Sequence, residues 1–404
     1  MNGLKTLSHK IAGVLFGIAL ALSIAECLLR LFPHLMPVAA QIRHRAESEV
    51  KIDREVWIPD SYLGYKLPPN LDTLLEAFPE EPYRVRTTSL GYDDIGFRSA
   101  PRDGRPAAAL VGDSFTFAEG VSQEDSWATQ LAGRTGWNVL NFGLNGYGPP
   151  QYTRMLTRYA LPLKPGLVLW VFCPNDFGNA YDFHAAIEQG KGAVGYRWRR
   201  QRSRLARAGD AAWTALRDHS FACDSLSWAI HAWKQGASVT IRTEHVQFAT
   251  QWDYWGPLIA LHDERIHKGW LWTQEDLLEA RNAARAAGAE FVVVIIPFRE
   301  QVYWHLLQGK LPGWGDENPD GPGNLVGNFC AANNIRALDL APAFREAAQR
   351  GDEQLYFSGD GHWNPAGNRF VGNTIADFLK AEGLLPARPA ITGSEAFPTV
   401  PAGQ

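Results

Sequence analysis

The sequence predicts an α/β protein built on a mostly parallel sheet, and three observations lead to this fold class. Five short apolar segments recur along the chain, helical patterns separate them, and each ends in a glycine, proline or polar turn. Some are apolar at nearly every position, which is typical of parallel strands that are covered on both faces. The predicted strands are residues 106–111, 137–142, 167–172, 291–296 and 335–340.

Helical patterns fill most of the intervals between these strands. Thr273 is expected to cap one helix, with Asp276 completing a start that resembles a capping box. Asn364 and Pro365 are expected to open the last helix as its N-cap and first residue. The predicted helices are residues 126–135, 151–160, 273–287, 324–333 and 365–379.

One long segment interrupts this alternation. Residues 179–270 are rich in Arg, Trp and His, with helical stretches near 210–234 and no clear strand, so we expect a helical insertion. It lies within a domain that we assign to residues 106–385. The polar, proline-rich residues 41–105 are expected to form an irregular lead-in, and residues 386–404 a proline-rich tail.

The N-terminal 40 residues have the pattern of a signal anchor and juxtamembrane segment. Lys5 and Lys10 precede an uncharged apolar run of 15 residues, 11–25, and a helix over residues 11–32 would be about 33 Å long. We expect a single-pass transmembrane helix in the inner (cytoplasmic) membrane, with the rest of the chain extracytoplasmic, in the periplasm. The alternative is a signal peptide cleaved near residues 38–40, which would leave a secreted protein.

Composition excludes several classes of partner and cofactor. The net charge of the 404 residues is −4, without long runs of like charge, so nucleic acid is not an expected partner. The four cysteines lie far apart and lack the CxxC spacing of zinc sites. His262 and His267 are five residues apart rather than four, so they lack the geometry of a helical metal pair. We therefore expect neither a metal nor another cofactor.

Polar residues gather where ligands bind in parallel sheets, at the carboxyl ends of strands. Ser114, Gly143 and Asn175 follow the first three predicted strands, and Asp360 and His362 lie in the loop before the last helix. A serine hydroxyl needs a base, and a histidine base works best when a carboxylate orients it. The N–H groups of Ser114 and Gly143 and the Asn175 amide are expected to form an oxyanion hole. Each residue alone also fits an ordinary turn, but their joint occurrence favours catalysis.

The segments around these residues are similar to a known family. VGDSFTFAEGV, NFGLNGYG, FCPNDFGN and DGHWNPAG resemble the four consensus blocks of SGNH (GDSL) hydrolases, in their usual order. The resemblance covers about residues 88–178 and 272–382. It implies a three-layer, flavodoxin-like fold in which Ser114, Gly143, Asn175 and His362 are the residues of the family name. Asp360 would be the third member of the triad.

One departure from the family pattern bears on the substrate. Only Gly361 separates Asp360 from His362, where most of the family has two residues. This spacing, with Trp after His, resembles the SGNH domains of polysaccharide O-acetylation proteins, including those that act on alginate. It implies an acetyl ester on a glycan. Asp339 and Asp352 remain alternatives for the orienting carboxylate.

The sequence therefore predicts a serine esterase or O-acyltransferase that acts on acyl esters, acetyl above all, of an extracytoplasmic glycan. Triad residues do not separate the two activities, because the difference lies in which acceptor the pocket admits. The alternatives are a lipase or thioesterase of the same family, or a non-catalytic glycan-binding scaffold of a polysaccharide assembly complex. Expected partners are an acylated carbohydrate or other ester, the membrane, and polysaccharide assembly proteins.

Overall fold

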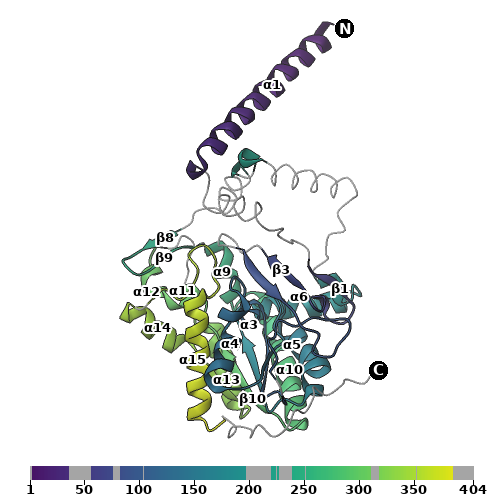
Figure 1. Cartoon of the computed structure of the whole chain (residues 1–404), viewed down its shortest axis with the longest axis vertical. Helices are drawn as coiled ribbons and strands as arrows, with labels where there is room; N and C mark the ends of the chain where they lie inside the picture. Colours follow the sequence, from purple (N-terminus) through teal and green to yellow (C-terminus); the bar gives the residue numbers. More distant parts are fainter. Residues whose placement is uncertain are drawn as a thin grey trace. The chain divides into compact units, whose positions relative to one another are not determined.

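The structure is a computed structural model, and it describes residues 2–35, 56–75, 82–102, 104–196, 220–223, 225–226, 239–250, 252–310, 318–351 and 353–384. The chain divides into two compact units (Figure 1). The first comprises Met1–Ile52, Pro79–Glu81 and Arg200–Gly236, and the second comprises Asp53–Phe78, Pro82–Arg199 and Ala237–Gln404. All five candidate site residues belong to the second unit.

A five-stranded parallel sheet forms the centre of the second unit and confirms the predicted fold class. Each observed strand lies within a residue or two of its predicted bounds. Along the sheet, the strands follow the order β11-β10-β7-β5-β6. Their bounds are β5 Ala108–Val111, β6 Val139–Asn141, β7 Leu167–Phe172, β10 Glu290–Ile295 and β11 Arg336–Asp339. In chain order this is 2-1-3-4-5, the flavodoxin-like arrangement, and it reverses direction between β5 and β7.

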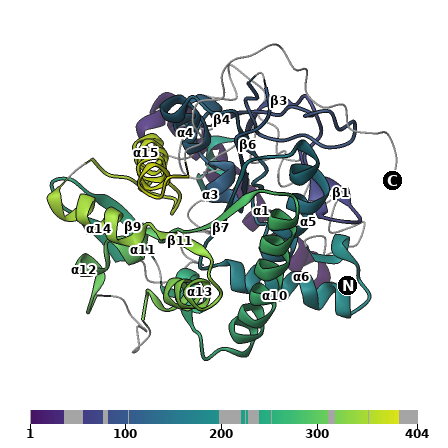
Figure 2. The ribbon, with the colours of Figure 1, turned by 90° about the horizontal axis from the view of Figure 1, so that it is seen from below.

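Helices cover both faces of the sheet, as parallel strands require (Figure 2). Alternate residues of β7 pack into two separate clusters, because successive side chains point to opposite faces. One cluster includes side chains from α5 (Pro149–Met155), α10 (Glu264–Ala286) and α13 (Gly321–Ala332). The other includes side chains from α4 (Trp127–Thr135), α14 (Ala341–Arg350) and α15 (Pro365–Ala381). The three layers hold the strand ends in fixed positions.

The helix starts were predicted with mixed success. Asn364 caps α15 as expected, since its side chain accepts a hydrogen bond from the Gly367 N–H. The predicted cap at Thr273 is wrong, because α10 begins nine residues earlier, where the Asp263 carboxylate accepts from two backbone N–H groups. Thr273 is buried inside this helix, and its hydroxyl donates to the Gly269 carbonyl. Asp276 is likewise a buried helical residue, not part of a capping box.

The segment predicted as an irregular lead-in instead contains two small antiparallel sheets. They pair β1 (Ile58–Asp60) with β2 (Gly64–Lys66), and β3 (Asp72–Leu75) with β4 (Tyr83–Arg86). Tyr65 is fully buried, and its hydroxyl donates to the Asn145 carbonyl at 2.5 Å. These residues therefore help to build the core beside the sheet. The strands were missed because three or four residues are too few to show a clear period.

The predicted insertion is only partly helical where it is described. It contains α6 (Asp176–Glu188), α9 (Trp252–Ile259) and the start of α10, but also the hairpin of β8 (Val239–Arg242) and β9 (Gln247–Thr250). Most of the helical stretch predicted near 210–234, and the tail 386–404, lie outside the described residues.

The first unit contains α1 (Asn2–Leu31), which carries the predicted anchor segment. Within it Glu26 pairs with Arg30 at 2.6 Å. Among the described residues, however, no helix is both long enough and apolar enough to cross a membrane. The predicted transmembrane helix is thus not found. Its uncharged run, residues 11–25, is shorter than the roughly 20 residues that a span needs.

Candidate active site

Ser114 lies at the carboxyl end of β5, next to the point where the strand order reverses. It is the first residue of α3 (Ser114–Phe117). The buried Asp113 caps this helix, since its Oδ1 accepts a hydrogen bond from the Phe115 N–H at 3.0 Å. The strand, the cap and the helix start together fix the serine. Ser114 itself is half-buried, so its hydroxyl is within reach of a ligand.

His362 is held in the loop before α15 by its aromatic neighbours. Trp363 is buried, and the ring of Phe115 packs against both His362 and Trp363, with centroids 4.7 and 4.8 Å apart. The His362 carbonyl accepts from the Phe357 N–H at 3.0 Å. Because Phe115 follows Ser114 in the chain, the same ring links the serine to the histidine.

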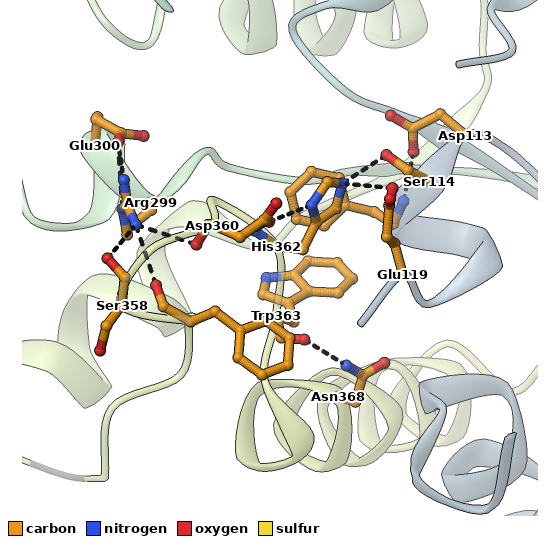
Figure 3. A network of polar contacts seen from close by, with 12 residues as sticks. Asp113, Ser114, Glu119, Arg299, Glu300, Ser358, Asp360, His362, Trp363 and Asn368 are labelled. Carbon is orange, nitrogen blue, oxygen red and sulfur yellow. Dashed lines mark hydrogen bonds and ion pairs between the residues drawn. The ribbon is translucent and has the colours of Figure 1, made fainter. Parts of the chain in front are cut away.

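The structure brings Ser114, His362 and Asp360 into one hydrogen-bonded row (Figure 3). His362 Nε2 lies 2.7 Å from Ser114 Oγ. On the other side of the ring, Nδ1 bonds Asp360 Oδ1, which also accepts from the His362 backbone N–H at 2.7 Å. One intervening residue is therefore enough for the carboxylate to orient the ring. Of the alternative carboxylates, Asp339 accepts from the Ala341 N–H at the start of α14, and Asp352 lies outside the described residues.

Three carboxylates set the charge of this row. Burial lowers the pKa of His362, but the charges of Asp360, Glu119 and Asp113 and the hydrogen bond that the ring donates to Asp360 outweigh burial and raise it to about 10. Burial raises the pKa of Asp360, but the charge of His362 and the two hydrogen bonds from that residue hold it below the usual value. The resting site thus favours an imidazolium paired with a carboxylate.

The three expected oxyanion donors differ in the interactions that they already make. Ser114 N–H belongs to the first turn of α3, where N–H groups have no acceptor within the helix. Asn175 follows β7, and its side chain opposes the rise that burial causes in the pKa of Asp113. Gly143 follows β6, but its N–H already donates to Asn141 Oδ1 at 2.9 Å. As an oxyanion donor, Gly143 would have to share that proton, and its role stays a prediction.

Sequence reasoning missed a buried arginine that supports the Asp360 loop. Arg299 follows β10 and is only 4% exposed. Its guanidinium donates to the carbonyls of Phe357, Ser358 and Asp360 at 3.1, 3.3 and 3.1 Å, and it pairs with Glu300 at 2.8 Å (Figure 3). The position just after the fourth strand was the available signal, because the carboxyl ends of parallel strands meet at one edge.

A second missed residue is Glu119, five positions after Ser114. Its carboxylate Oε2 lies 3.6 Å from His362 Nε2, on the serine side of the ring (Figure 3). The side chain of Glu119 is 29% exposed and that of His362 is 19% exposed. Glu119 lies within the segment VGDSFTFAEGV, but the resemblance gave it no role, so only the fold shows its proximity to the histidine.

Comparisons with known proteins agree with this geometry in part. Residues 267–400, about a third of the chain, match the family model described as the SGNH hydrolase-like domain of the acetyltransferase AlgX. The matched part includes Asp360 and His362 but begins well after Ser114, which it does not cover. Among curated proteins, no sequence matches the chain.

Two of the solved structures that the chain matches are described as an esterase and a hydrolase. A catalytic mutant of an acetylxylan esterase from Geobacillus stearothermophilus is 12% identical, with a TM-score of 0.37 over 70% of this chain and 97% of that chain. An α/β hydrolase from the metagenome of Lake Arreo, Spain, is 14% identical, with a TM-score of 0.38 over 71% of this chain and 99% of that chain. The family match confirms the predicted class, an SGNH-type ester hydrolase or O-acetyltransferase, and residues 267–400 resemble the SGNH hydrolase-like domain of the acetyltransferase AlgX.

Proposed function

We propose that this chain transfers the acyl group of an ester, most often acetyl, through a covalent intermediate on Ser114. The observation that carries the proposal is the row of Asp360, His362 and Ser114, in which a serine hydroxyl meets a carboxylate-oriented imidazole at 2.7 Å. A hydroxyl in this setting can lose its proton as it attacks, which is the requirement for a serine nucleophile. A merely structural serine would not need this arrangement.

The first half-reaction makes the acyl-enzyme. Neutral His362 takes the Ser114 proton at Nε2 while Oγ forms a bond to the ester carbonyl carbon, and the carbonyl electron pair moves onto oxygen. Donors such as the Ser114 N–H and the Asn175 amide stabilise that oxyanion. The pair then re-forms the carbonyl, the bond to the alcohol oxygen breaks, and the alcohol leaves with the proton from Nε2.

The second half-reaction reverses these steps with a new hydroxyl. Water or a sugar hydroxyl gives its proton to Nε2 and attacks the acyl carbon. When the tetrahedral intermediate collapses, Ser114 Oγ leaves and recovers the proton. Water produces a free acid and makes the enzyme an esterase, whereas a sugar produces a new ester and makes it an O-acyltransferase.

A glycan ester is the substrate class that we propose. Two observations support it: the matched family model is named for an acetyltransferase, and the Asp360-Gly361-His362-Trp363 segment has the spacing seen in polysaccharide O-acetylation domains. Assays with acetylated oligosaccharides, with long-chain acyl esters and with acyl thioesters will separate this substrate from those of a lipase or thioesterase. Mass spectrometry of the products distinguishes hydrolysis from transfer to an added oligosaccharide.

The test of the nucleophile compares the purified chain with S114A and H362A in hydrolysis of 4-nitrophenyl acetate. We expect both variants to lose activity by roughly 10³-fold or more. The matched controls are S122A and H305A, because Ser122 makes no side-chain cap hydrogen bond and His305 is exposed. Full activity in S114A would refute the mechanism. An inactive wild type that still binds oligosaccharide would favour the non-catalytic scaffold.

We also propose that the domain acts outside the cytoplasm. Lys5 and Lys10 ahead of the uncharged residues 11–25 form the pattern of an export signal. An alkaline phosphatase fused to the C-terminus of the full chain should then be active, because that enzyme needs an oxidising compartment. A fusion active only after cell lysis under oxidising conditions would contradict export. N-terminal sequencing of the mature protein will show whether the signal is cleaved or retained.

A further inference from the structure

Two acidic side chains flank His362 on opposite sides, and only one of them belongs to the triad. Asp360 bonds Nδ1, whereas Glu119 lies 3.6 Å from Nε2, the nitrogen that faces Ser114. At 3.6 Å the carboxylate is within ion-pair range of that nitrogen but beyond a good hydrogen bond. A hydroxyl group that approaches Nε2 therefore meets Glu119 as a second acceptor.

Hydrogen bonds from a buried arginine fix the turn that carries Glu119. Ala118 ends α3 in the left-handed conformation, with φ of 64°. Arg98, which is 3% exposed, donates to the carbonyls of Phe117 and Ala118 at 2.6 Å each, and also to that of Val121. A buried guanidinium thus donates hydrogen bonds to backbone carbonyls on both sides of Glu119. Such bonds restrict where the carboxylate can go.

The same turn also packs against the loop of the triad. Gly120 has φ of +85°, and a Cβ there would stand 2.6 Å from the ring of Phe357. Phe357 in turn donates its N–H to the His362 carbonyl. The position of Glu119 relative to the histidine is therefore set by contact between two loops, and we treat it as a built feature of the site.

We propose that Glu119 binds the acceptor molecule of the second half-reaction. The inference rests on the proposed function. Once Ser114 carries the acyl group, its Oγ has no proton, so Nε2 must receive one from the acceptor. Water has a second O–H group, which can donate a hydrogen bond to the Glu119 carboxylate. A sugar hydroxyl has only one proton, but a hydroxyl on the neighbouring carbon can donate to Glu119. The acceptor class is thus water or a sugar with adjacent hydroxyls.

The test follows the two half-reactions separately in E119Q, which keeps the shape of the side chain and removes its charge. With 4-nitrophenyl acetate, the first rapid release of nitrophenol reports acylation, and the steady rate reports deacylation. Because the charge of Glu119 also raises the pKa of His362, each enzyme is compared at the pH where its own rate has levelled off. There we expect E119Q to acylate within about threefold of wild type and to deacylate about 10-fold to 100-fold more slowly, the effect of a lost charged acceptor. Intact-protein mass spectrometry should show the acetyl group accumulating on the variant.

The matched control is E346Q, which removes an exposed carboxylate on α14 that is paired with Arg350. We expect it to leave both rates unchanged. Equal losses of acylation and deacylation in E119Q would overturn the proposal, as would unchanged rates, because neither outcome fits a group that acts on the acceptor. If E119Q does not fold, E119D replaces it, because its carboxylate is one methylene farther from the acceptor. We expect E119D to deacylate more slowly than wild type and to acylate within about threefold of it, and equal losses of both rates would overturn the proposal.

Acceptor competition provides an independent readout. Wild type should deacylate faster with a methyl xyloside, which has adjacent hydroxyls, than with an equal concentration of ethanol, and E119Q should lose most of that preference. A preference retained in E119Q would overturn the acceptor role. Failure of the proposed function has a different signature: wild type would form no acetyl-enzyme at all, or S114A would form as much as wild type.

Discussion

Replacing Arg299 by methionine should damage stability and activity by two separable routes. The side chain is 4% exposed and pairs with Glu300, which is itself buried. Removing one partner of a buried pair leaves an uncompensated charge and costs about 3–5 kcal/mol. R299M also removes the donors for three carbonyls of the loop that carries Asp360. We expect a loss of stability of this size and a kcat lower by about 10²-fold, as when a catalytic group is misplaced by about 1 Å.

A second substitution separates the two routes. In R299M/E300Q the buried charge is gone, and the new amide oxygen can still accept from the Thr250 hydroxyl, which bonds Glu300 at 2.7 Å. We expect the double variant to regain half or more of the lost stability but little of the lost kcat. R299K keeps the charge, yet its single ammonium cannot reproduce the planar fork. It should be nearer to wild type in stability than in kcat.

Urea denaturation and ester hydrolysis under the same conditions provide both numbers. The control is R336M, at an exposed arginine that pairs with Glu290 at 2.7 Å, where a change within about 1 kcal/mol is expected. Wild-type kcat in R299M/E300Q would refute the reasoning, because it would mean that the loop keeps its geometry without the arginine. Wild-type stability in R299M would refute the energetic half.

Three further predictions concern the same site. Because the carboxylates raise the pKa of His362 to about 10, and only the neutral imidazole can accept a proton, kcat/KM should rise with pH up to about 10; a profile that levels off near pH 7 would contradict this. N175D should lower kcat about 10²-fold to 10³-fold by removing an oxyanion donor, and it should also destabilise the fold by placing a second carboxylate beside Asp113, whereas N175A should show mainly the kinetic loss. G143A should lose stability and activity together, since a Cβ there would stand 2.6 Å from the Thr116 side chain; a melting curve like that of wild type would show that the turn can adjust.

Much of the fold was readable because the central strands are buried on both faces. In β7 every residue is buried, so the strand appears in the sequence as an uninterrupted run of apolar residues. The site residues were readable for a related reason: they follow strands whose ends the topology brings to one edge. Ser114, His362 and Asp360 also lie in segments that resemble family blocks. Local patterns and fold topology agreed at these positions.

What sequence reasoning missed depends on contacts between distant segments. Glu119 stands in a turn, and Arg299 is the first residue of the four-residue helix α11 (Arg299–Val302), which is too short to show a period. Their roles arise only where distant segments touch. The start of α10 was misplaced because Thr273 is a plausible cap by itself, and only tertiary packing reveals that the helix continues through it. The short strands β1 to β4 are stable only against the core, so their own residues carry little signal.

The long reach between serine and histidine also orders events in time. The two residues are 248 positions apart. The helix α15, which follows the histidine loop, is joined to α4 by a hydrogen bond in which Asn368 Oδ1 accepts from the Trp127 N–H at 3.1 Å. At roughly 5–20 residues per second, a ribosome needs some tens of seconds to travel that distance. A nascent chain in which Ser114 has already been synthesised therefore has no base for this serine until the loop before α15 is made. A chain truncated before that point would lack His362 and would therefore be inactive.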